Sequence, residues 1–364
     1  MKIVRIGAPE TIMSHPESRY NYFGWPTVKR LQDGRIAVGA SGFRKRHVCP
    51  YGKAVISYSS DGGKSYTSPI PVIDTSLDDR DCGIATFGES GMIVTSFNNT
   101  VAFQMKYADE EDRGHLSKIT REDEARDIGA NFCISHDGGV SFGNIHKSPV
   151  TSPHGPLELS DGTVLWLGRT FSPINDRLDN DCVQAYRILE GGEMEYVGQI
   201  DNISVEGGVP LLCEPTLLQL EDGTLLAHIR VQCYSVGLFT IYQSKSFDLG
   251  KTWTTPKQIL ADCGGAPAHL LRHSSGTLIS VYGNRGAPVG APPFGINAVF
   301  SEDGGEHWSE PQVIYENTVS HDLGYPSTVE LDDGSLLSVF YAKRSEDEGA
   351  VIMQQKWRME DEKI

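Results

Sequence analysis

Six segments of this chain repeat one short pattern, in which an apolar run, a turn with Gly and a second apolar run follow one another. The turn glycines are Gly34, Gly91, Gly162, Gly223, Gly276 and Gly334. Asp-Gly or Ser-Gly between two runs rich in Val, Ile and Leu is typical of a β-hairpin. Since these glycines lie roughly 60 residues apart, each repeat has room for about four strands. The sequence therefore predicts an all-β, six-bladed β-propeller of four-stranded antiparallel blades.

A second repeat, Ser-x-Asp-x-Gly-x-x-aromatic, occurs four times. The four copies span residues 59–66, 135–142, 246–253 and 301–308. The Asp accepts hydrogen bonds from backbone N–H groups of a turn, the Gly supplies a positive φ, and the aromatic ring packs over the turn. We name these segments Asp boxes. We predict that they are structural turns between the later strands of a blade, and we assign them no chemistry.

The repeats extend over nearly all of the chain, so we predict one propeller domain over residues 1–364. The run at 1–6 is expected to add an outer strand to the last blade and to close the ring. A charged insertion around 105–128 interrupts the second blade. We expect it to be a solvated surface loop, partly helical, with a flap and an oligomer contact as the alternatives.

The formal net charge is -16, which makes nucleic acid and anionic membranes poor candidate partners. A small anionic ligand remains compatible with it, because local arginines decide such binding. We see no apolar run long enough for a signal peptide or a membrane span. The seven cysteines include no C-x-x-C pair, so we expect reduced thiols and a cytoplasmic protein.

The innermost hairpin of each blade runs from one face of the disc to the other and back. Residues about nine before the turn glycine and about seven to ten after it should therefore meet at one mouth of the central channel. Before the glycine stand Trp25, Cys82, Pro153 with His154, Glu214, Pro267 and Tyr325. After it stand Arg44, Asn98, Arg169, Arg230, Arg285 and Tyr341. Charges crowded at a central pocket are costly unless they are paired or used, so this mouth is the predicted site.

Glu214 and Tyr325 are the strongest catalytic candidates at this mouth. Tyr is a poor nucleophile alone and needs a base such as Glu. A neutral nucleophile suits a substrate carbon that carries a carboxylate, and guanidinium groups bind carboxylates through two hydrogen bonds. The structural alternative is that Glu214 only pairs with Arg230 and that Tyr325 is a packed aromatic.

These residues resemble the sialidase (neuraminidase) superfamily, which is a six-bladed propeller with Asp boxes. The segment GYPSTVELDDG resembles the one that bears the family's tyrosine nucleophile, here Tyr325. CEPTLLQLEDGTLLAHIR resembles the one with the assisting glutamate and an arginine, here Glu214 and Arg230. The resemblance places a further carboxylate-binding arginine at Arg285. It implies an exo-acting glycosidase for an acidic sugar, with a tyrosine nucleophile.

The first blade departs from the family pattern. The family has Phe-Arg-Ile-Pro where this chain has Phe23-Gly24-Trp25-Pro26, so one arginine is missing. The loop SGFRKRHVCPYGK should carry the acidic proton donor, but it contains no Asp or Glu. Two candidates for the donor remain open, His47 and Asp81, and Asp79 also lies near.

The predicted function is a sialidase-like exo-glycoside hydrolase acting on sialic acid or a related acidic sugar. The candidate substrate-binding residues are Trp25, Arg44, Arg80, His154, Arg169, Arg230, Arg285 and Tyr341. Trp25 is expected at the pocket rim, where it would stack on a sugar ring. The alternatives are a non-catalytic carbohydrate-binding propeller and a sugar-acid lyase or epimerase with His47, His154 or Tyr325 as base. We predict no cofactor and no metal, since the histidines are dispersed and the shared Asp-box pattern offers one carboxylate.

Overall fold

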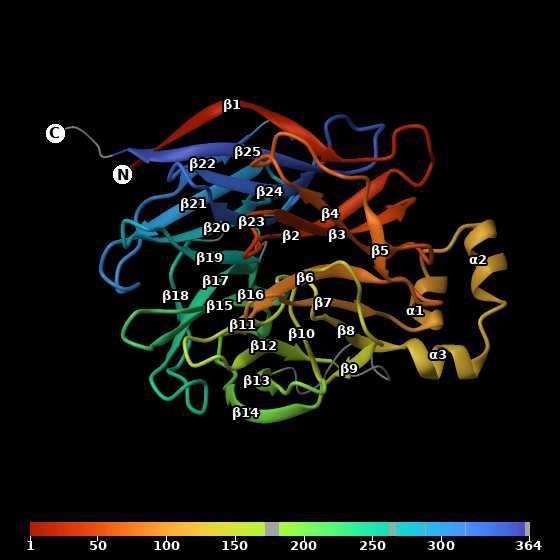
Figure 1. The fold of residues 1–364 in the computed structure, drawn as a ribbon, viewed down its shortest axis with the longest axis horizontal. Helices are drawn as coiled ribbons and strands as arrows, with labels where there is room; N and C mark the ends of the chain where they lie inside the picture. Colours follow the sequence, from red (N-terminus) through yellow and green to blue (C-terminus); the bar gives the residue numbers. More distant parts are fainter. Residues whose placement is uncertain (172–181, 262–263, 265–266, 288, 317, 361–364) are drawn as a thin grey trace.

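The computed structural model describes residues 1–171, 182–261, 264, 267–287, 289–316 and 318–360. Cys263, one of the seven cysteines expected to be reduced, lies outside these residues. Six antiparallel sheets surround a central axis, so the chain is the predicted six-bladed propeller (Figure 1). None of the helices in the described ranges is long and apolar enough to cross a bilayer.

The first three blades follow one another along the chain, each beginning with its innermost strand. Blade 1 contains β2 (Tyr22–Arg30), β3 (Ile36–Arg44), β4 (Lys53–Ser59) and β5 (Ile70–Ile73). Blade 2 contains β6 (Arg80–Phe87), β7 (Gly91–Asn98), β8 (Gly129–Ser135) and β9 (His146–Ser148). Blade 3 contains β10 (Val150–Thr151), β11 (Leu157–Glu158), β12 (Val164–Thr170), β13 (Val183–Ile188) and β14 (Met194–Ile200), with β10 and β11 both paired to β12.

The other three blades complete the ring. Blade 4 contains β15 (Leu211–Gln219), β16 (Leu225–Cys233), β17 (Leu238–Ser246) and β18 (Lys257–Gln258), with the 3-10 helix η1 (Tyr234–Val236) after β16. Blade 5 contains β19 (Ala268–Arg272), β20 (Leu278–Asn284), β21 (Gly295–Ser301) and β22 (Gln312–Tyr315). Blade 6 contains β23 (Gly324–Glu330), β24 (Leu336–Ala342), β25 (Val351–Glu360) and β1 (Lys2–Met13). The predicted closure is confirmed, because β1 pairs antiparallel with β25 from Lys2 opposite Glu360 onward.

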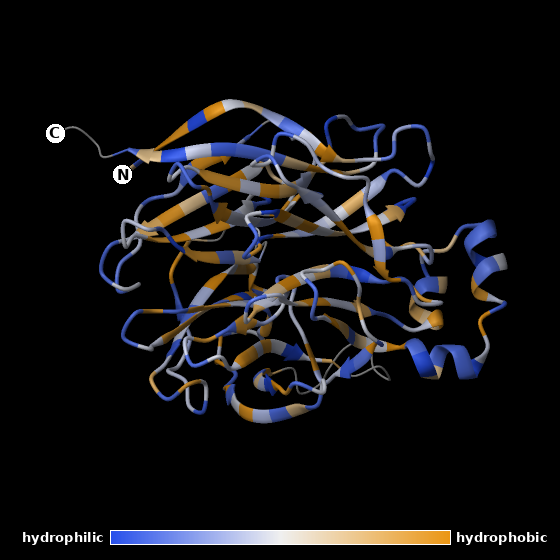
Figure 2. Cartoon of the chain, viewed as in Figure 1, coloured by the Kyte–Doolittle hydropathy of each residue, from blue (hydrophilic) through white to orange (hydrophobic). Residues whose placement is uncertain are grey.

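The inner and middle strands are buried because neighbouring blades cover both of their faces. In β8 and β24 every residue is buried, and apolar clusters fill the spaces between adjacent sheets. Continuous apolar runs rather than alternating ones are what such doubly covered strands require. Hydrophobic residues accordingly follow the strands of the blades in Figure 2.

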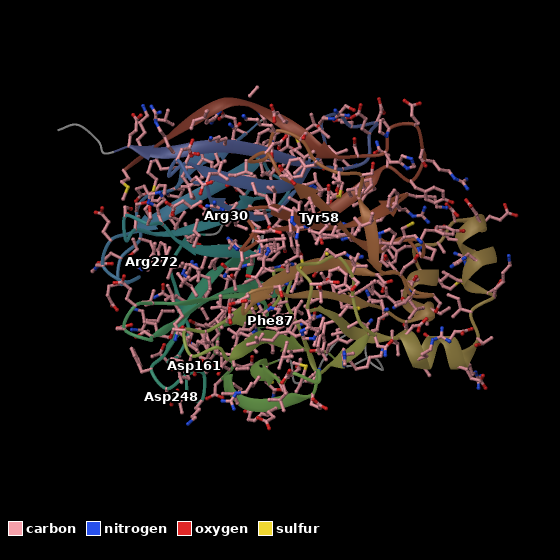
Figure 3. All side chains as sticks on the ribbon, in the orientation of Figure 1. Arg30, Tyr58, Phe87, Asp161, Asp248 and Arg272 are labelled. Atoms are coloured by element: carbon pink, nitrogen blue, oxygen red, sulfur yellow. The ribbon has the colours of Figure 1, made fainter. Side chains whose placement is uncertain are left out.

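The four Asp boxes are turns between the third and fourth strands of blades 1, 2, 4 and 5. In the first box, Oδ1 of Asp61 accepts hydrogen bonds from the backbone N–H groups of Lys64 and Ser65, at 3.0 and 2.9 Å. The hydroxyl of Ser59 donates to Asp61 and accepts from the N–H of Gly63. The same contacts recur in the other boxes, including the one that contains Asp248, labelled in Figure 3. The boxes are thus the structural turns that the sequence predicts.

The hairpin glycines form the predicted turns in five blades, where they have positive φ angles from 73° to 93° at residues 34, 162, 223, 276 and 334. Blade 2 differs, and Gly91 is not its turn glycine. The turn residue with positive φ is Gly88, at 53°, and Gly91 already begins β7. Counting nine residues back from Gly91 therefore does not give the residue at the channel mouth in this blade.

The charged insertion of blade 2 forms three short helices, α1 (Val101–Met105), α2 (Glu110–Leu116) and α3 (Arg121–Asp127). The helices project from the edge of the ring in Figure 1, and α2 and α3 are mostly hydrophilic in Figure 2. Lys45, from the loop after β3, lies 2.7 Å from Asp109 and 2.6 Å from the buried Asp112. The insertion is thus ion-paired to the loop that carries His47.

Candidate active site

Four innermost strands begin with the same distortion of the backbone. β2, β6, β15 and β23 each contain a β-bulge, in which one residue adopts a left-handed conformation. The four residues and their φ angles are Trp25 (54°), Asp81 (58°), Glu214 (49°) and Tyr325 (48°). Such conformations are uncommon for residues with large side chains, and they concentrate at functional sites. The bulges therefore mark one mouth of the channel as the candidate site.

Tyr325 and Glu214 form the centre of this site, although 111 residues separate them in the sequence. The Tyr325 hydroxyl donates a hydrogen bond of 2.5 Å to Oε1 of Glu214. Nη1 of Arg230 lies 2.5 Å from Oε2 of the same carboxylate and 3.4 Å from the Tyr325 hydroxyl. Glu214 thus pairs with Arg230, as the structural alternative proposes, and also accepts a hydrogen bond from the Tyr325 hydroxyl.

The surroundings of Tyr325 keep its phenol protonated. The side chain is 6% exposed. Burial and the negative charge of Glu214 raise the pKa of Tyr325 well above its usual value, against the opposing effect of Arg230. A phenol of this kind reacts as a nucleophile only when a base takes its proton during the attack. Glu214 is the base within hydrogen-bonding distance.

A second arginine, Arg285, supports the other side of the Tyr325 ring. Its guanidinium carbon lies 5.6 Å from the centre of that ring. Nε and Nη2 donate to the carbonyl oxygen of Leu323, and Nη2 also donates to the Tyr341 hydroxyl at 3.1 Å. Tyr341 in turn donates to Asp322. These contacts fix the guanidinium beside the nucleophile candidate.

Asp81 and Glu214 line one small cavity of about 110 Å³. Arg169 and Arg230 contribute positive charge to the same cavity, and Phe97, Cys213 and Gln232 complete much of its wall. No group in the described part of the chain donates a hydrogen bond to the Asp81 carboxylate. Burial and the charge of Glu214 raise the pKa of Asp81 to about 7. Asp81 can therefore carry a proton near neutral pH, inside the cavity that contains Glu214.

His47, the other candidate donor, lies outside this small cavity and its side chain is 53% exposed. Nε2 is 3.1 Å from Nη2 of Arg80, and Nδ1 is 3.5 Å from Asp322. Since a guanidinium only donates, Nε2 accepts, and the ring proton belongs on Nδ1. Desolvation and Arg80 lower the pKa of His47, although Asp322 opposes them. Asp79 also has a pKa raised to about 7 by burial, but its carboxylate is held by Thr75.

The structure places three predicted binding residues below the surface. Trp25 is 1% exposed, which corrects its expected position at the rim, because the guanidiniums of Arg44 and Arg80 cover its ring at 4.8 and 4.5 Å. Arg44 is fully buried and paired with Asp78 at 2.6 Å, so its charge is already compensated. Arg80 donates to the carbonyl oxygen of His47. These residues hold the first blade and its loop in place.

His154 lies on the other side of the channel floor from Glu214. Its neighbour Pro153 lines the small cavity, whereas His154 lines a different pocket together with Thr216. The floor is tightly packed, since a Cβ added to Gly83 would lie 2.4 Å from the backbone nitrogen of Gly155. His154, in the turn between β10 and β11, therefore lines a pocket other than the one that contains Glu214.

Asp322 is the main site residue that the sequence did not reveal. Its carboxylate accepts hydrogen bonds from the hydroxyls of Tyr22, at 3.0 Å, and Tyr341, at 3.2 Å, and it also faces His47. It lies in the connection before β23, where no repeat places it. Within the described ranges, no three His, Cys, Asp or Glu side chains come together as metal ligands.

The ring of six blades, the Asp boxes and the bulged site define a sialidase-like β-propeller. Residues 121–339 match the model of the BNR repeat-like domain family, which is more than half of the chain. The chain therefore belongs to this family, as a divergent sialidase-like member. A comparison with the sequences of curated proteins found no match.

Solved structures with the same fold have little sequence identity with this chain. A Dyadobacter fermentans protein of unknown function is 18% identical, with a TM-score of 0.76 and coverage of 98% of this chain and 99% of that one. A variant of the NanB sialidase from Streptococcus pneumoniae is 13% identical, with a TM-score of 0.67 and coverage of 98% and 71%. An alpha-L-arabinanase from Penicillium chrysogenum is 11% identical, with a TM-score of 0.60 and coverage of 97% and 98%. At these identities the likeness shows a glycoside hydrolase-like fold.

Proposed function

We propose that this protein is an exo-acting glycoside hydrolase that cleaves a terminal sugar bearing a carboxylate, such as sialic acid or a related acidic sugar. The observation that carries the proposal is the 2.5 Å hydrogen bond from the Tyr325 hydroxyl to Glu214. A buried phenol paired with a carboxylate base, beside several guanidiniums, is the arrangement that a neutral nucleophile requires.

In the first step, the Tyr325 oxygen attacks the anomeric carbon while Glu214 accepts the phenol proton. Arg230 compensates the charge of Glu214 before the transfer. A neutral phenol approaches an anomeric carbon that carries a carboxylate without the repulsion that an Asp or Glu nucleophile would meet. Arg169 and Arg285 are the groups that we assign to the substrate carboxylate.

Asp81 is the residue that we assign as the proton donor. Its pKa of about 7 lets it carry a proton near neutral pH, and it lines the same cavity as Glu214. It protonates the leaving oxygen in the first step. In the second step its carboxylate takes a proton from a water molecule whose oxygen attacks the anomeric carbon. The bond to Tyr325 breaks, and Glu214 returns the phenol proton. His47 is a weaker candidate, because Nε2 already accepts a hydrogen bond from Arg80.

The first blade indicates that the preferred sugar differs from an ordinary sialoside. Trp25 lies in the strand where the family has Arg-Ile, and Arg44 is neutralised by Asp78. The carboxylate must therefore be bound from the side of blades 3 to 5, where Arg169, Arg230 and Arg285 lie.

A panel of aryl glycosides that includes sialosides and uronides tests this proposal. We expect release of the aryl group from at least one acidic glycoside, and loss of turnover in Tyr325→Phe with an unchanged melting curve. Tyr242→Phe, on β17 of blade 4, is the control variant for the loss of a phenol hydroxyl.

Turnover by Tyr325→Phe at the wild-type rate would refute the tyrosine mechanism. Sugar binding without product would instead support a carbohydrate-binding propeller. An unsaturated product that absorbs in the ultraviolet would support a lyase.

A further inference from the structure

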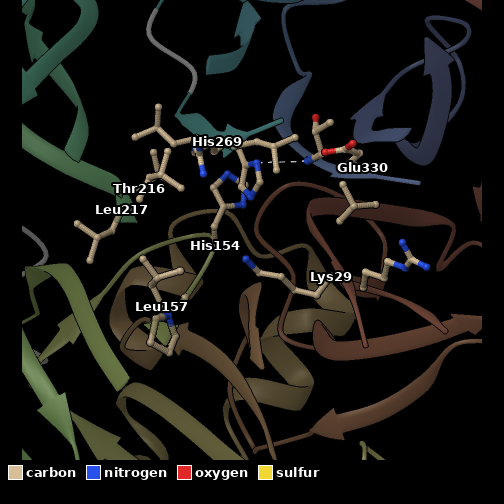
Figure 4. Close-up of a pocket in the computed structure, with 16 residues that line it drawn as sticks. Lys29, His154, Leu157, Thr216, Leu217, His269 and Glu330 are labelled. Atoms are coloured by element: carbon tan, nitrogen blue, oxygen red, sulfur yellow. Dashed lines mark hydrogen bonds between the residues drawn. The ribbon is translucent and has the colours of Figure 1, made fainter. Parts of the chain in front are cut away.

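The opposite mouth of the channel contains a second pocket, of about 320 Å³, that the proposed reaction does not use. The inner strands reach it after they leave the candidate active site. β15, for example, provides Glu214 to the first site and Thr216 and Leu217 to this pocket. We name it the axial pocket, and Figure 4 shows the residues that line it.

Lys29 is the one cation lining the axial pocket that has no ion pair among the described residues. Of the other charged lining residues, Arg30 pairs with Asp332 and Arg272 pairs with Glu221. The carboxylate of Glu330, also in the wall, accepts a hydrogen bond of 2.8 Å from the N–H of Ser274 and lies 3.4 Å from Nε2 of His273. Within the described ranges no carboxylate forms an ion pair with Lys29, which is half-buried. In Figure 4 its ammonium group points toward the ring of His154.

His269 adds a directed hydrogen-bond donor. Its Nδ1 accepts the backbone N–H of Thr328 at 3.3 Å, so Nε2 carries the ring proton. No described residue accepts a hydrogen bond from this Nε2–H. The ring is 5% exposed, and the ring of His154 meets it edge to face, with 5.2 Å between centres.

His154 provides an independent sign that hydrogen bonding in this pocket is incomplete. It is 5% exposed, and its Nε2 is buried without a partner among the described residues. Buried polar atoms in native proteins are almost always paired, so an orphaned one calls for an explanation. Burial and the charge of Lys29 lower the pKa of His154 to about 3, and they also lower that of His269. Both rings are therefore neutral, and Lys29 is the cation of the wall that has no ion-pair partner among the described residues.

The rest of the wall is apolar. It is formed by Pro156, Leu157, Leu217, Leu218, Leu270, Leu271 and Val329. A single ammonium matches a monoanion, whereas a phosphate dianion would retain uncompensated charge in this apolar setting. We propose that the axial pocket binds a small organic carboxylate, with the carboxylate between Lys29 and His269 and an apolar body against the leucines.

Isothermal titration of the full chain with cyclohexanecarboxylate tests this site. We expect saturable binding at one site, and at least about tenfold weaker binding of cyclohexanecarboxamide, which has the same shape without the charge. The absence of saturable binding by the carboxylate would overturn the proposal, as would equal affinities for the two probes.

Two variants locate the binding. Lys29→Met keeps the length of the side chain and removes its charge, and His269→Phe keeps a planar ring and removes the Nε2–H. Each is expected to weaken the binding of cyclohexanecarboxylate at least about tenfold, after melting curves show that it folds. If one variant does not fold, the other decides the result.

The controls separate this pocket from the candidate active site. Lys64→Met, on the exposed first Asp box, removes a charge elsewhere, and Arg169→Met removes one from the first cavity. Both should bind the probe as the wild type does. Unchanged binding by Lys29→Met, or loss of binding in Arg169→Met, would overturn the proposal. The measurement needs no turnover, so it is independent of the proposed hydrolase activity.

Discussion

The β-bulges at the channel mouth and the Asp boxes at the outer turns both repeat four times, but different features are constant in each. Every Asp box keeps the same Ser and Asp and the same hydrogen bonds. The bulges keep the same backbone conformation and present four different side chains, those of Trp25, Asp81, Glu214 and Tyr325. A repeat whose side chains are constant stabilises the ring. A repeat whose side chains vary is a common support on which a site is built.

The largest expected effect is a loss of turnover when a side chain of one of the β-bulges is substituted. Glu214→Gln removes the base for Tyr325, so kcat on an identified acidic glycoside should fall by about 10²- to 10⁴-fold. Glu310→Gln, at an exposed surface position, should leave kcat unchanged. Comparable rates in the two variants would show that the bulged carboxylate has no role in catalysis.

The next effect is on the pH dependence of kcat/KM, which distinguishes Asp81 from His47 as the proton donor. The pKa of Asp81 is about 7, so its protonated form is lost as the pH rises through 7, and kcat/KM should fall there. Asp81→Asn should lower kcat/KM by about 10²-fold or more and abolish this alkaline limb. If His47→Gln rather than Asp81→Asn removes the limb, the assignment of the donor is wrong.

The Asp81→Asn variant should be more stable than the wild type at neutral pH. The folded-state pKa of Asp81 lies above the value near 4 of an unfolded chain, so its contribution to stability is present below pH 4 and is lost as the pH rises to 7. Asn does not ionise. The free energy of unfolding of Asp81→Asn should exceed that of the wild type by about 1 to 4 kcal/mol at pH 8, and the difference should shrink toward pH 4. Denaturant titrations at both pH values measure this difference.

A substitution in an Asp box should lower the stability of the protein and leave turnover unchanged. The Ser301 hydroxyl is buried, donates to Asp303 and accepts the N–H of Gly305 at 2.9 Å. Ser301→Ala leaves that N–H without its partner and should lower the free energy of unfolding by about 1 to 2 kcal/mol. The rate on any substrate should stay the same at a temperature where the variant is folded. A selective loss of activity would contradict the division between bulges and boxes.

The smallest effect is expected to be stabilising. Leu249 has a φ of 58° in the third box, where the other boxes have Gly62, Gly138 and Gly304. Its side chain is 42% exposed, so little apolar burial is lost on removal. Leu249→Gly should raise the free energy of unfolding by about 0.5 to 1 kcal/mol. Gly304→Ala, at the equivalent position, should change it in the opposite direction.

The sequence predicted the ring because its signals are local. A turn glycine between apolar runs and a box of eight residues each specify a hairpin without distant contacts. Counting along the inner strands also predicted that Glu214 and Tyr325 lie at the same mouth of the channel. In blade 2 the count from Gly91 selected Cys82, because the turn uses Gly88, and the bulged residue is Asp81.

At the site, the expected positions of some side chains differ from the observed ones because of contacts with residues that the repeats do not place. Arg44 has the correct position in its hairpin, but Asp78, from the connection before the next blade, neutralises it. Trp25 is covered by guanidiniums from two blades. His154 directly follows Pro153, yet the two residues line different pockets of the channel. Such pairings depend on the packing between blades, which repeats cannot reveal.

The closure of the ring has a consequence for biosynthesis. Among the described strands, β1 comes first along the chain, yet its partner β25 comes last. During translation β1 is therefore without its partner until β25 has been made, and a truncation before residue 351 would leave β1 permanently unpaired. Prematurely terminated chains should for this reason be prone to aggregation.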